Sequence, residues 1–166
     1  MRPMKDKLRK CTDCGLLKPL SDFHERKRVK TTYVRKECFK CVELRRRARI
    51  SASYESFLQH LWTRTKNRVA RGKATAKEFS IPEGYLQTLW TESDGRCALS
   101  GVHMTHHTDG SGRKDLNASV DRIDVERGYV PGNVQLVCYR VNIMRNTLGV
   151  SEFYWWIKTI HDHSCD

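Results

Sequence analysis

The most informative segment of the chain runs Asn117-Ala-Ser-Val-Asp-Arg-Ile-Asp124, then Val-Glu-Arg-Gly-Tyr-Val-Pro-Gly132, then Asn133-Val-Gln-Leu-Val-Cys138 and Tyr-Arg-Val-Asn142. Residues 118–123 predict a short strand, and residues 134–137 predict a return strand because their side chains alternate in polarity. Glycine and proline between them are typical of a tight connection. A helix is expected over residues 138–148, ending near Gly149.

This order of elements is expected to bring Asp121 and Asn142, from opposite ends of the segment, onto one face. A carboxylate oxygen and an amide oxygen are ligands that suit a hard cation such as Mg²⁺. The segment therefore predicts a small site built from a strand and a helix.

The segment resembles the HNH (ββα-metal) endonuclease family, most closely the phage-encoded members with an Asp-Arg-Ile-Asp strand, a Gly-Tyr loop and an Asn-Val-Gln strand. The resemblance covers roughly residues 80–150. It implies a small α+β fold: a ββα-metal (HNH/His-Me finger) nuclease core flanked by helices, with an N-terminal zinc ribbon as in several members. The implied activity is metal-dependent hydrolysis of DNA phosphodiester bonds, by nicking or by double-strand cleavage.

The resemblance also implies roles for individual residues. Asp121 and Asn142 would ligate a catalytic Mg²⁺ or Mn²⁺, and Asn133 would tie the loop together and orient the catalytic residue. A base-activated water would attack phosphorus while the cation stabilises the developing charge.

The chain departs from the family pattern at the general base, because Arg122 stands where a histidine is expected. Arginine is not deprotonated in proteins and cannot accept the proton of water, although it could bind the scissile phosphate through its two-pronged guanidinium. If the register is shifted by one residue, Asp121 itself takes the base position. Otherwise the base comes from elsewhere, with His103 favoured among these candidates: Asp124, Tyr129, His103, His106 and His107.

Two Cys-x-x-Cys pairs, Cys11/Cys14 and Cys38/Cys41, lie 23 residues apart. Four thiolates in this spacing are typical of a structural zinc site with no open position for water. The intervening stretch is too short and polar to fold without the metal. Where relatives carry a second set of knuckles, this chain keeps only Cys97 and Cys138, which we expect in the core.

Charge is unevenly distributed along the chain, whose formal net charge is +12. Residues 1–49 hold 17 Lys/Arg and 6 Asp/Glu, whereas residues 50–166 hold 14 and 13. This imbalance favours a polyanionic partner, most simply duplex DNA. The residues expected to contact it are Arg45, Arg46, Arg47, Arg49, Arg64, Lys66, Arg68 and Arg71.

The expected organisation is a basic zinc-ribbon module (1–49), a basic connecting helix (50–79) and an HNH nuclease domain (80–166). Phe153, Trp156, Ile157 and Ile160 have helical spacing, and we expect this stripe to pack as core in place of the second zinc. The sequence has no apolar run of membrane-spanning length and no secretory signal, which favours a cytoplasmic monomer (host cytoplasm for a phage protein) with no small-molecule substrate. Two alternatives stay open: a catalytically inactive HNH-fold DNA-binding protein, and a protein-interaction adaptor built on the ribbon.

Overall fold

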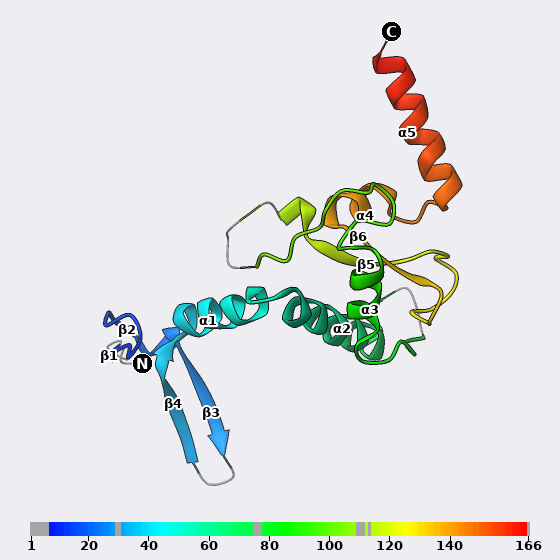
Figure 1. Ribbon diagram of the computed structural model, residues 1–166. Coiled ribbons are helices and arrows are strands. Elements are labelled where there is room, and N and C mark those ends of the chain that lie inside the picture. Colours follow the sequence, from blue (N-terminus) through cyan, green and yellow to red (C-terminus); the bar gives the residue numbers. More distant parts are fainter. Residues whose placement is uncertain (1–6, 29–30, 75–77, 109–111, 113, 166) are drawn as a thin grey trace, which may run out of the picture. The chain divides into compact units, whose positions relative to one another are not determined.

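The computed structural model describes residues 7–28, 31–74, 78–108, 112 and 114–165 (Figure 1). Within these residues the chain has five α-helices and three two-stranded antiparallel sheets, so the prediction of a small α+β protein is confirmed. The chain divides into two compact units, Met1–Arg49 and Ile50–Asp166. No helix in the described part of the chain is long and apolar enough to cross a membrane.

The first unit consists of two small hairpins and most of a helix. In chain order its elements are β1 (Leu8–Lys10), β2 (Leu17–Pro19), the 3-10 turn η1 (Leu20–Asp22), β3 (Phe23–Arg28), β4 (Thr31–Cys38) and α1 (Phe39–Ser51). β1 pairs with β2, and β3 pairs with β4. Its core is very small, since the buried residues are Cys11, Phe23 and Cys38. Apolar packing on this scale is small, so a metal ion held by the four cysteines would supply much of the folding energy of this unit.

The second unit is built around one larger core. Its elements are α2 (Tyr54–Ala70), α3 (Tyr85–Glu92), η2 (Lys114–Leu116), β5 (Ala118–Arg122), β6 (Val134–Cys138), α4 (Tyr139–Arg145) and α5 (Val150–Ser164). Ser53 caps α2 by accepting a hydrogen bond from the Ser56 amide, and Phe57 and Leu58 carry this helix into the core. α2 thus packs in the same core as β5 and β6. The expected boundary between a connecting helix (50–79) and a nuclease domain (80–166) stays a prediction. Cys97 and Cys138 are also buried in this core, as expected from the sequence.

The strand–loop–strand–helix segment forms an antiparallel hairpin followed by a short helix. Ser119 and Asp121 of β5 lie on the face that α4 covers, because residues two apart in a strand share a face. α2 contacts β5 and α3 contacts β6. α4 is shorter than expected: it ends at Arg145 because Asn146 takes a left-handed φ of 52°.

The prediction that the apolar stripe of α5 packs as core is wrong. Only Phe153, in the first turn, is buried, whereas Trp156, Ile157 and Ile160 are 46%, 38% and 58% exposed. The Tyr154 hydroxyl donates to the Leu99 carbonyl at 2.7 Å and anchors this first turn. Helical spacing therefore predicted the helix correctly. It could not reveal that only the first turn of α5 packs against the core.

Candidate active site and metal centre

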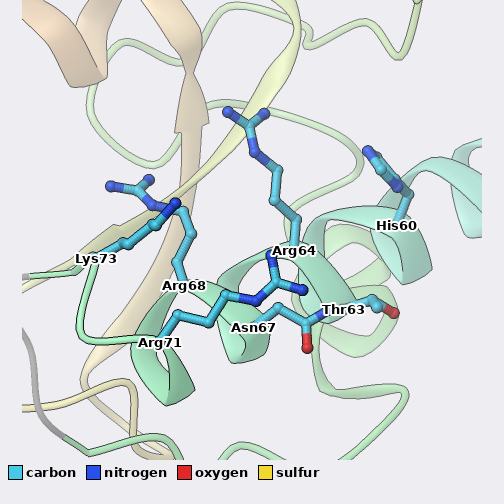
Figure 2. Close-up of a pocket in the computed structure, with 7 residues that line it drawn as sticks. All are labelled: His60, Thr63, Arg64, Asn67, Arg68, Arg71 and Lys73. Atoms are coloured by element: carbon cyan, nitrogen blue, oxygen red, sulfur yellow. The ribbon is translucent and has the colours of Figure 1, made fainter.

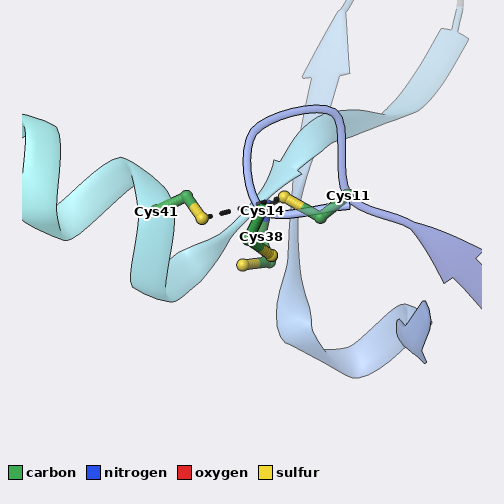
Figure 3. A group of neighbouring side chains, drawn as sticks. All are labelled: Cys11, Cys14, Cys38 and Cys41. Atoms are coloured by element: carbon green, nitrogen blue, oxygen red, sulfur yellow. Dashed lines mark hydrogen bonds between the residues drawn. The ribbon is translucent and has the colours of Figure 1, made fainter. Parts of the chain in front are cut away.

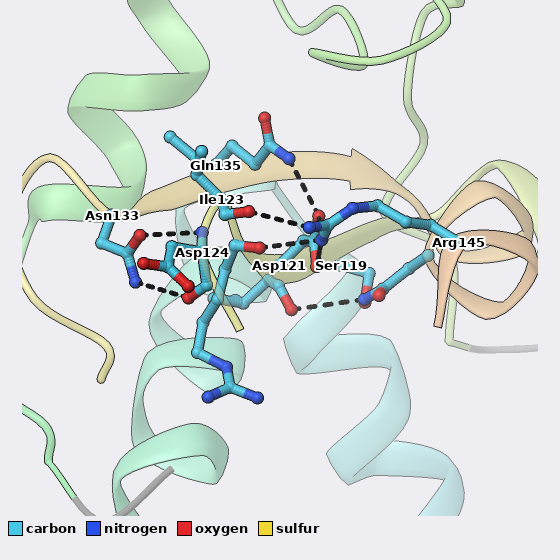
Figure 4. Close-up of polar contacts among 10 residues, drawn as sticks. Ser119, Asp121, Ile123, Asp124, Asn133, Gln135 and Arg145 are labelled. Atoms are coloured by element: carbon cyan, nitrogen blue, oxygen red, sulfur yellow. Dashed lines mark hydrogen bonds and ion pairs between the residues drawn. The ribbon is translucent and has the colours of Figure 1, made fainter. Parts of the chain in front are cut away.

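The α4-facing side of the hairpin holds a buried ion pair between Asp121 and Arg145 (Figure 4). Asp121 is 6% exposed, and Arg145, the last residue of α4, is 0% exposed. The Arg145 Nη1 group donates to both carboxylate oxygens at 2.8 Å. Gln135, the cross-strand partner of Asp121, donates to Oδ2 at 2.9 Å. The carboxylate is therefore neutralised by an arginine and bonded at both oxygens.

Arg145 also holds the backbone at the end of β5. Its Nη1 donates to the carbonyl of Arg122 and its Nη2 to the carbonyl of Ile123, each at 2.8 Å. Its Nε is buried and has no hydrogen-bond partner in the described part of the chain. We did not anticipate this residue from the sequence. The available signal was its position three residues after Asn142, which places both on one face of a helix.

Asn142 contacts the same strand one turn earlier in α4. Its Nδ2 donates to the Ser119 hydroxyl at 2.7 Å and to the Val120 carbonyl at 3.3 Å. The hairpin and α4 thus bring Asn142 and Asp121 to the same side of β5, but no hydrogen bond joins the two side chains among the described residues.

The residues do not fit the divalent cation that the family resemblance implies at Asp121. Mg²⁺ needs oxygen ligands at about 2.0–2.1 Å. Both oxygens of Asp121 already accept hydrogen bonds from Arg145. A divalent ion placed there would lie beside a buried guanidinium, which repels it. In this arrangement of side chains, Asp121 therefore has no oxygen available to bind a metal ion together with Asn142.

Asn133 holds the loop that connects the two strands of the hairpin. It is buried, its Nδ2 donates to the carbonyls of Asp124 (3.0 Å) and Gly128 (2.9 Å), and its Oδ1 accepts from the Asp124 amide at 2.9 Å. Both main-chain groups of Asp124 are thus fixed by one side chain. The Asp124 carboxylate is exposed two residues beyond β5, and its Oδ1 accepts from the Glu126 amide at 2.9 Å.

Arg122 lies over this loop. Its Nη1 donates to the carbonyls of Val125 and Arg127, and its guanidinium lies 5.5 Å from the centre of the Tyr129 ring. These contacts make Arg122 a brace of the loop. Any grip on a phosphate would have to use the rest of its guanidinium.

The main chain that carries His103 lies beside the start of β5 and not beside Asp121. His103 forms an isolated bridge with Arg96, and Thr105, two residues later, pairs in parallel with Asn117. This segment therefore runs beside the beginning of β5, whereas Asp121 lies four residues further along, a distance of roughly 13 Å at 3.3 Å per residue. Of the sequence candidates, Asp124 and Tyr129 lie at the Asp121 end of the hairpin.

The four cysteines of the first unit come together as a candidate metal centre (Figure 3). Their sulfur atoms all lie within 4.8 Å of one another, and those of Cys11 and Cys41 are 3.8 Å apart. A tetrahedral zinc–thiolate centre places its sulfurs about 3.8 Å apart, so the donor set fits a structural metal ion. Cys38 and Cys41 flank the start of α1, and Cys11 and Cys14 lie in the turn between β1 and β2.

Polar groups around the cysteines favour thiolates at two of them. Backbone N–H groups of Cys14 and Cys38 lower the pKa of Cys11 to about 6. The pKa of Cys38 is lowered by the Cys41 amide and by the Lys18 ammonium, which donates to its sulfur at 3.4 Å. Burial and the neighbouring thiols raise the pKa of Cys41 to about 12. A bound cation would relieve this crowding of negative charge, as metal binding to thiolates does.

The arginines expected to contact DNA from α1 are largely paired within their own unit. Arg45 lies 2.8 Å from Asp13 and 3.1 Å from Glu37. Arg46 and Arg47 both bind Glu43 at 2.8 Å and lower its pKa to about 2. These pairs reduce the positive charge that α1 offers to a polyanion.

Basic residues of α2 and of the segment just after it line a hollow (Figure 2). A hollow of about 270 Å³ is lined by His60, Thr63, Arg64, Asn67, Arg68, Arg71 and Lys73. No salt bridge of its arginines or of Lys73 occurs among the described residues. Lys66, predicted to act with them, instead lies 4.8 Å over the Trp62 ring, off this surface. We refer to the seven lining residues as the α2 hollow.

Comparison with known proteins gives limited information on family. No protein-family model matches the chain, and no curated protein matches it. Among solved structures, the chain is similar to the rare-cutting HNH restriction endonuclease PacI, with 16% identity, a TM-score of 0.44, and coverage of 93% of this chain and 94% of that chain. Similarity at this level does not show that the chain belongs to that family.

Proposed function

We propose that this protein is an endonuclease that binds duplex DNA and hydrolyses its phosphodiester bonds. The observation that carries the proposal is the β5–β6–α4 unit, in which one asparagine, Asn133, fixes both main-chain groups of Asp124, three residues after Asp121. Because Asn133 is buried and holds the main chain that carries an exposed carboxylate, it gives Asp124 the fixed support that a reactive centre needs. The α2 hollow supplies cations for the DNA backbone.

Asp124 is the proposed proton acceptor. A water molecule attacks phosphorus, its proton passes to the Asp124 carboxylate, and the bond from phosphorus to the 3′ oxygen breaks. The leaving oxygen takes a proton from solvent, which gives a 3′-hydroxyl and a 5′-phosphate. A carboxylate can take this role when it lies within hydrogen-bond reach of the attacking water.

The resemblance implies Mg²⁺ or Mn²⁺ at Asp121 and Asn142. Because Arg145 covers both oxygens of Asp121, the proposed hydrolysis uses the protein's own residues and no cation at Asp121. In the first unit the four cysteines fit a structural ion, which we propose to be Zn²⁺.

Conversion of supercoiled plasmid tests the role of Asp124. We expect Asp124→Asn to abolish conversion and to leave DNA affinity unchanged, since the exposed amide keeps the size of the side chain. Glu126→Gln, two residues away in the same loop, removes the same charge and should keep wild-type cleavage. Equal cleavage by wild type and Asp124→Asn would refute Asp124 as the base.

A second candidate function is DNA binding without catalysis. It is favoured by two observations: Arg122 stands where the family has its histidine, and Arg145 closes Asp121. This function predicts that wild-type protein binds plasmid and leaves it intact in Mg²⁺ and in Mn²⁺. The same assay therefore separates the two functions.

A further inference from the structure

The Asp121–Arg145 ion pair is buried, and Arg145 holds it with several hydrogen bonds. Arg145 makes four hydrogen bonds, two to the carboxylate of Asp121 and two to the carbonyls of Arg122 and Ile123. All four acceptors belong to residues 121–123, at the end of β5 and just beyond it, so one guanidinium clamps the end of the strand to the end of α4. The side chain is fully buried, and its Nε has no hydrogen-bond partner among the described residues.

A divalent ion in this position would do the same work for Asp121. It would neutralise the carboxylate and fix the direction of its oxygens, as metal ions do in sites built from carboxylates. Arginine does this with a guanidinium that stays charged at every relevant pH. Here its Nη1 donates to both oxygens of Asp121, and its Nη2 donates to the Ile123 carbonyl. The two cations are therefore alternatives for one carboxylate, and the side chains here are arranged for arginine.

We infer that Arg145 is the built-in cation of the β5–β6–α4 unit, a positioning residue that holds Asp121 in place of a divalent metal ion. The unit then keeps its geometry without metal at Asp121. The inference is independent of whether the protein cleaves DNA, because it concerns how Asp121 is neutralised in the free protein.

Thermal unfolding of the full-length protein tests the clamp. Arg145→Met keeps the length of the side chain but leaves Asp121 buried without a counter-ion, and should lower the melting temperature by more than about 10 °C. Arg140→Met is the matched control: Arg140 lies on the same helix and pairs with Asp115 at 2.9 Å, but on the surface. We expect this control to shift the melting temperature by at most about 2 °C. Arg145→Lys, which keeps the charge, should recover part of the loss.

Mn²⁺ binding, followed by electron paramagnetic resonance without DNA, tests the replacement of metal. Wild type and Asp121→Asn should bind the same number of Mn²⁺ ions, because Asp121 holds none. This comparison remains decisive if Arg145→Met fails to fold. The inference is overturned if wild type binds one more Mn²⁺ than Asp121→Asn, or if Arg145→Met is as stable as Arg140→Met.

Discussion

The α2 hollow leads to a quantitative prediction about DNA binding. Arg64 and Arg68 of α2 and Arg71, the residue that caps its C-terminus, recur at spacings of four and three, and all three line the hollow. An elongated row of cations suits consecutive phosphates of a strand better than it suits a single small anion. The perturbation that tests this is the triple variant Arg64→Ala/Arg68→Ala/Arg71→Ala.

The expected effect follows from counterion release. Each lost phosphate contact flattens the dependence of log affinity on log salt by about 0.9, so three contacts flatten it by about 2.7. At about 0.1 M salt, one decade below 1 M, three contacts correspond to a loss of affinity of up to roughly 500-fold. Imperfect contacts make the measured loss smaller, but the change in slope should remain close to two or three units.

Fluorescence anisotropy of a labelled duplex, measured over a series of NaCl concentrations without divalent cations, gives this slope directly. Lys66→Ala is the matched control, because Lys66 lies on the same helix but over the Trp62 ring. Its slope should stay near that of wild type. The assignment of the α2 hollow would be refuted if the triple variant kept the wild-type slope, or if Lys66→Ala flattened it by as much per charge.

Three further predictions follow from the fold. A chelator that removes metal from the four cysteines should reduce the far-ultraviolet circular dichroism while leaving tryptophan fluorescence unchanged, because all four tryptophans lie in residues 50–166; a simultaneous change in fluorescence would contradict independent units. Asn133→Ala should lower the free energy of unfolding by about 2–4 kcal/mol in urea, since the buried Gly128 carbonyl loses its donor, and a neutral effect would show that water replaces the amide. Ile160→Ser should change that free energy by less than about 0.5 kcal/mol, and a loss above about 2 kcal/mol would mean that the α5 stripe is covered in solution.

Local patterns in the sequence were sufficient to predict the hairpin and the helix of the candidate site. Alternating residues in β6 and the glycines of the connecting loop are properties of the chain itself, and the structure contains both strands at nearly the expected bounds. The four cysteines could likewise be assigned to one cluster, because two Cys-x-x-Cys turns present paired sulfurs wherever the rest of the chain goes.

Partners across the fold were beyond local patterns. From the sequence, Arg145 could not be distinguished from other basic residues near the end of a helix. Its pairing with Asp121 depends on tertiary packing. His103 is close to the motif in sequence, yet Thr105, two residues later, pairs with Asn117, just before β5 begins and away from Asp121. Lys66 is charged and lies on the same helix as Arg64 and Arg68, but its ammonium group lies over the Trp62 ring. In each case the chemistry of the residue was evident, and its neighbour was not.

The proposed phosphodiester hydrolysis is tested most directly by incubating supercoiled plasmid with wild-type protein, at concentrations where anisotropy shows the DNA to be fully bound. Parallel reactions contain Mg²⁺, Mn²⁺ or no added divalent ion. We predict that wild type converts the plasmid to open-circular or linear DNA in at least one of these reactions. Asp124→Asn should convert none in any of them. Plasmid that is fully bound by wild type and stays supercoiled in every reaction would contradict the endonuclease and support DNA binding alone.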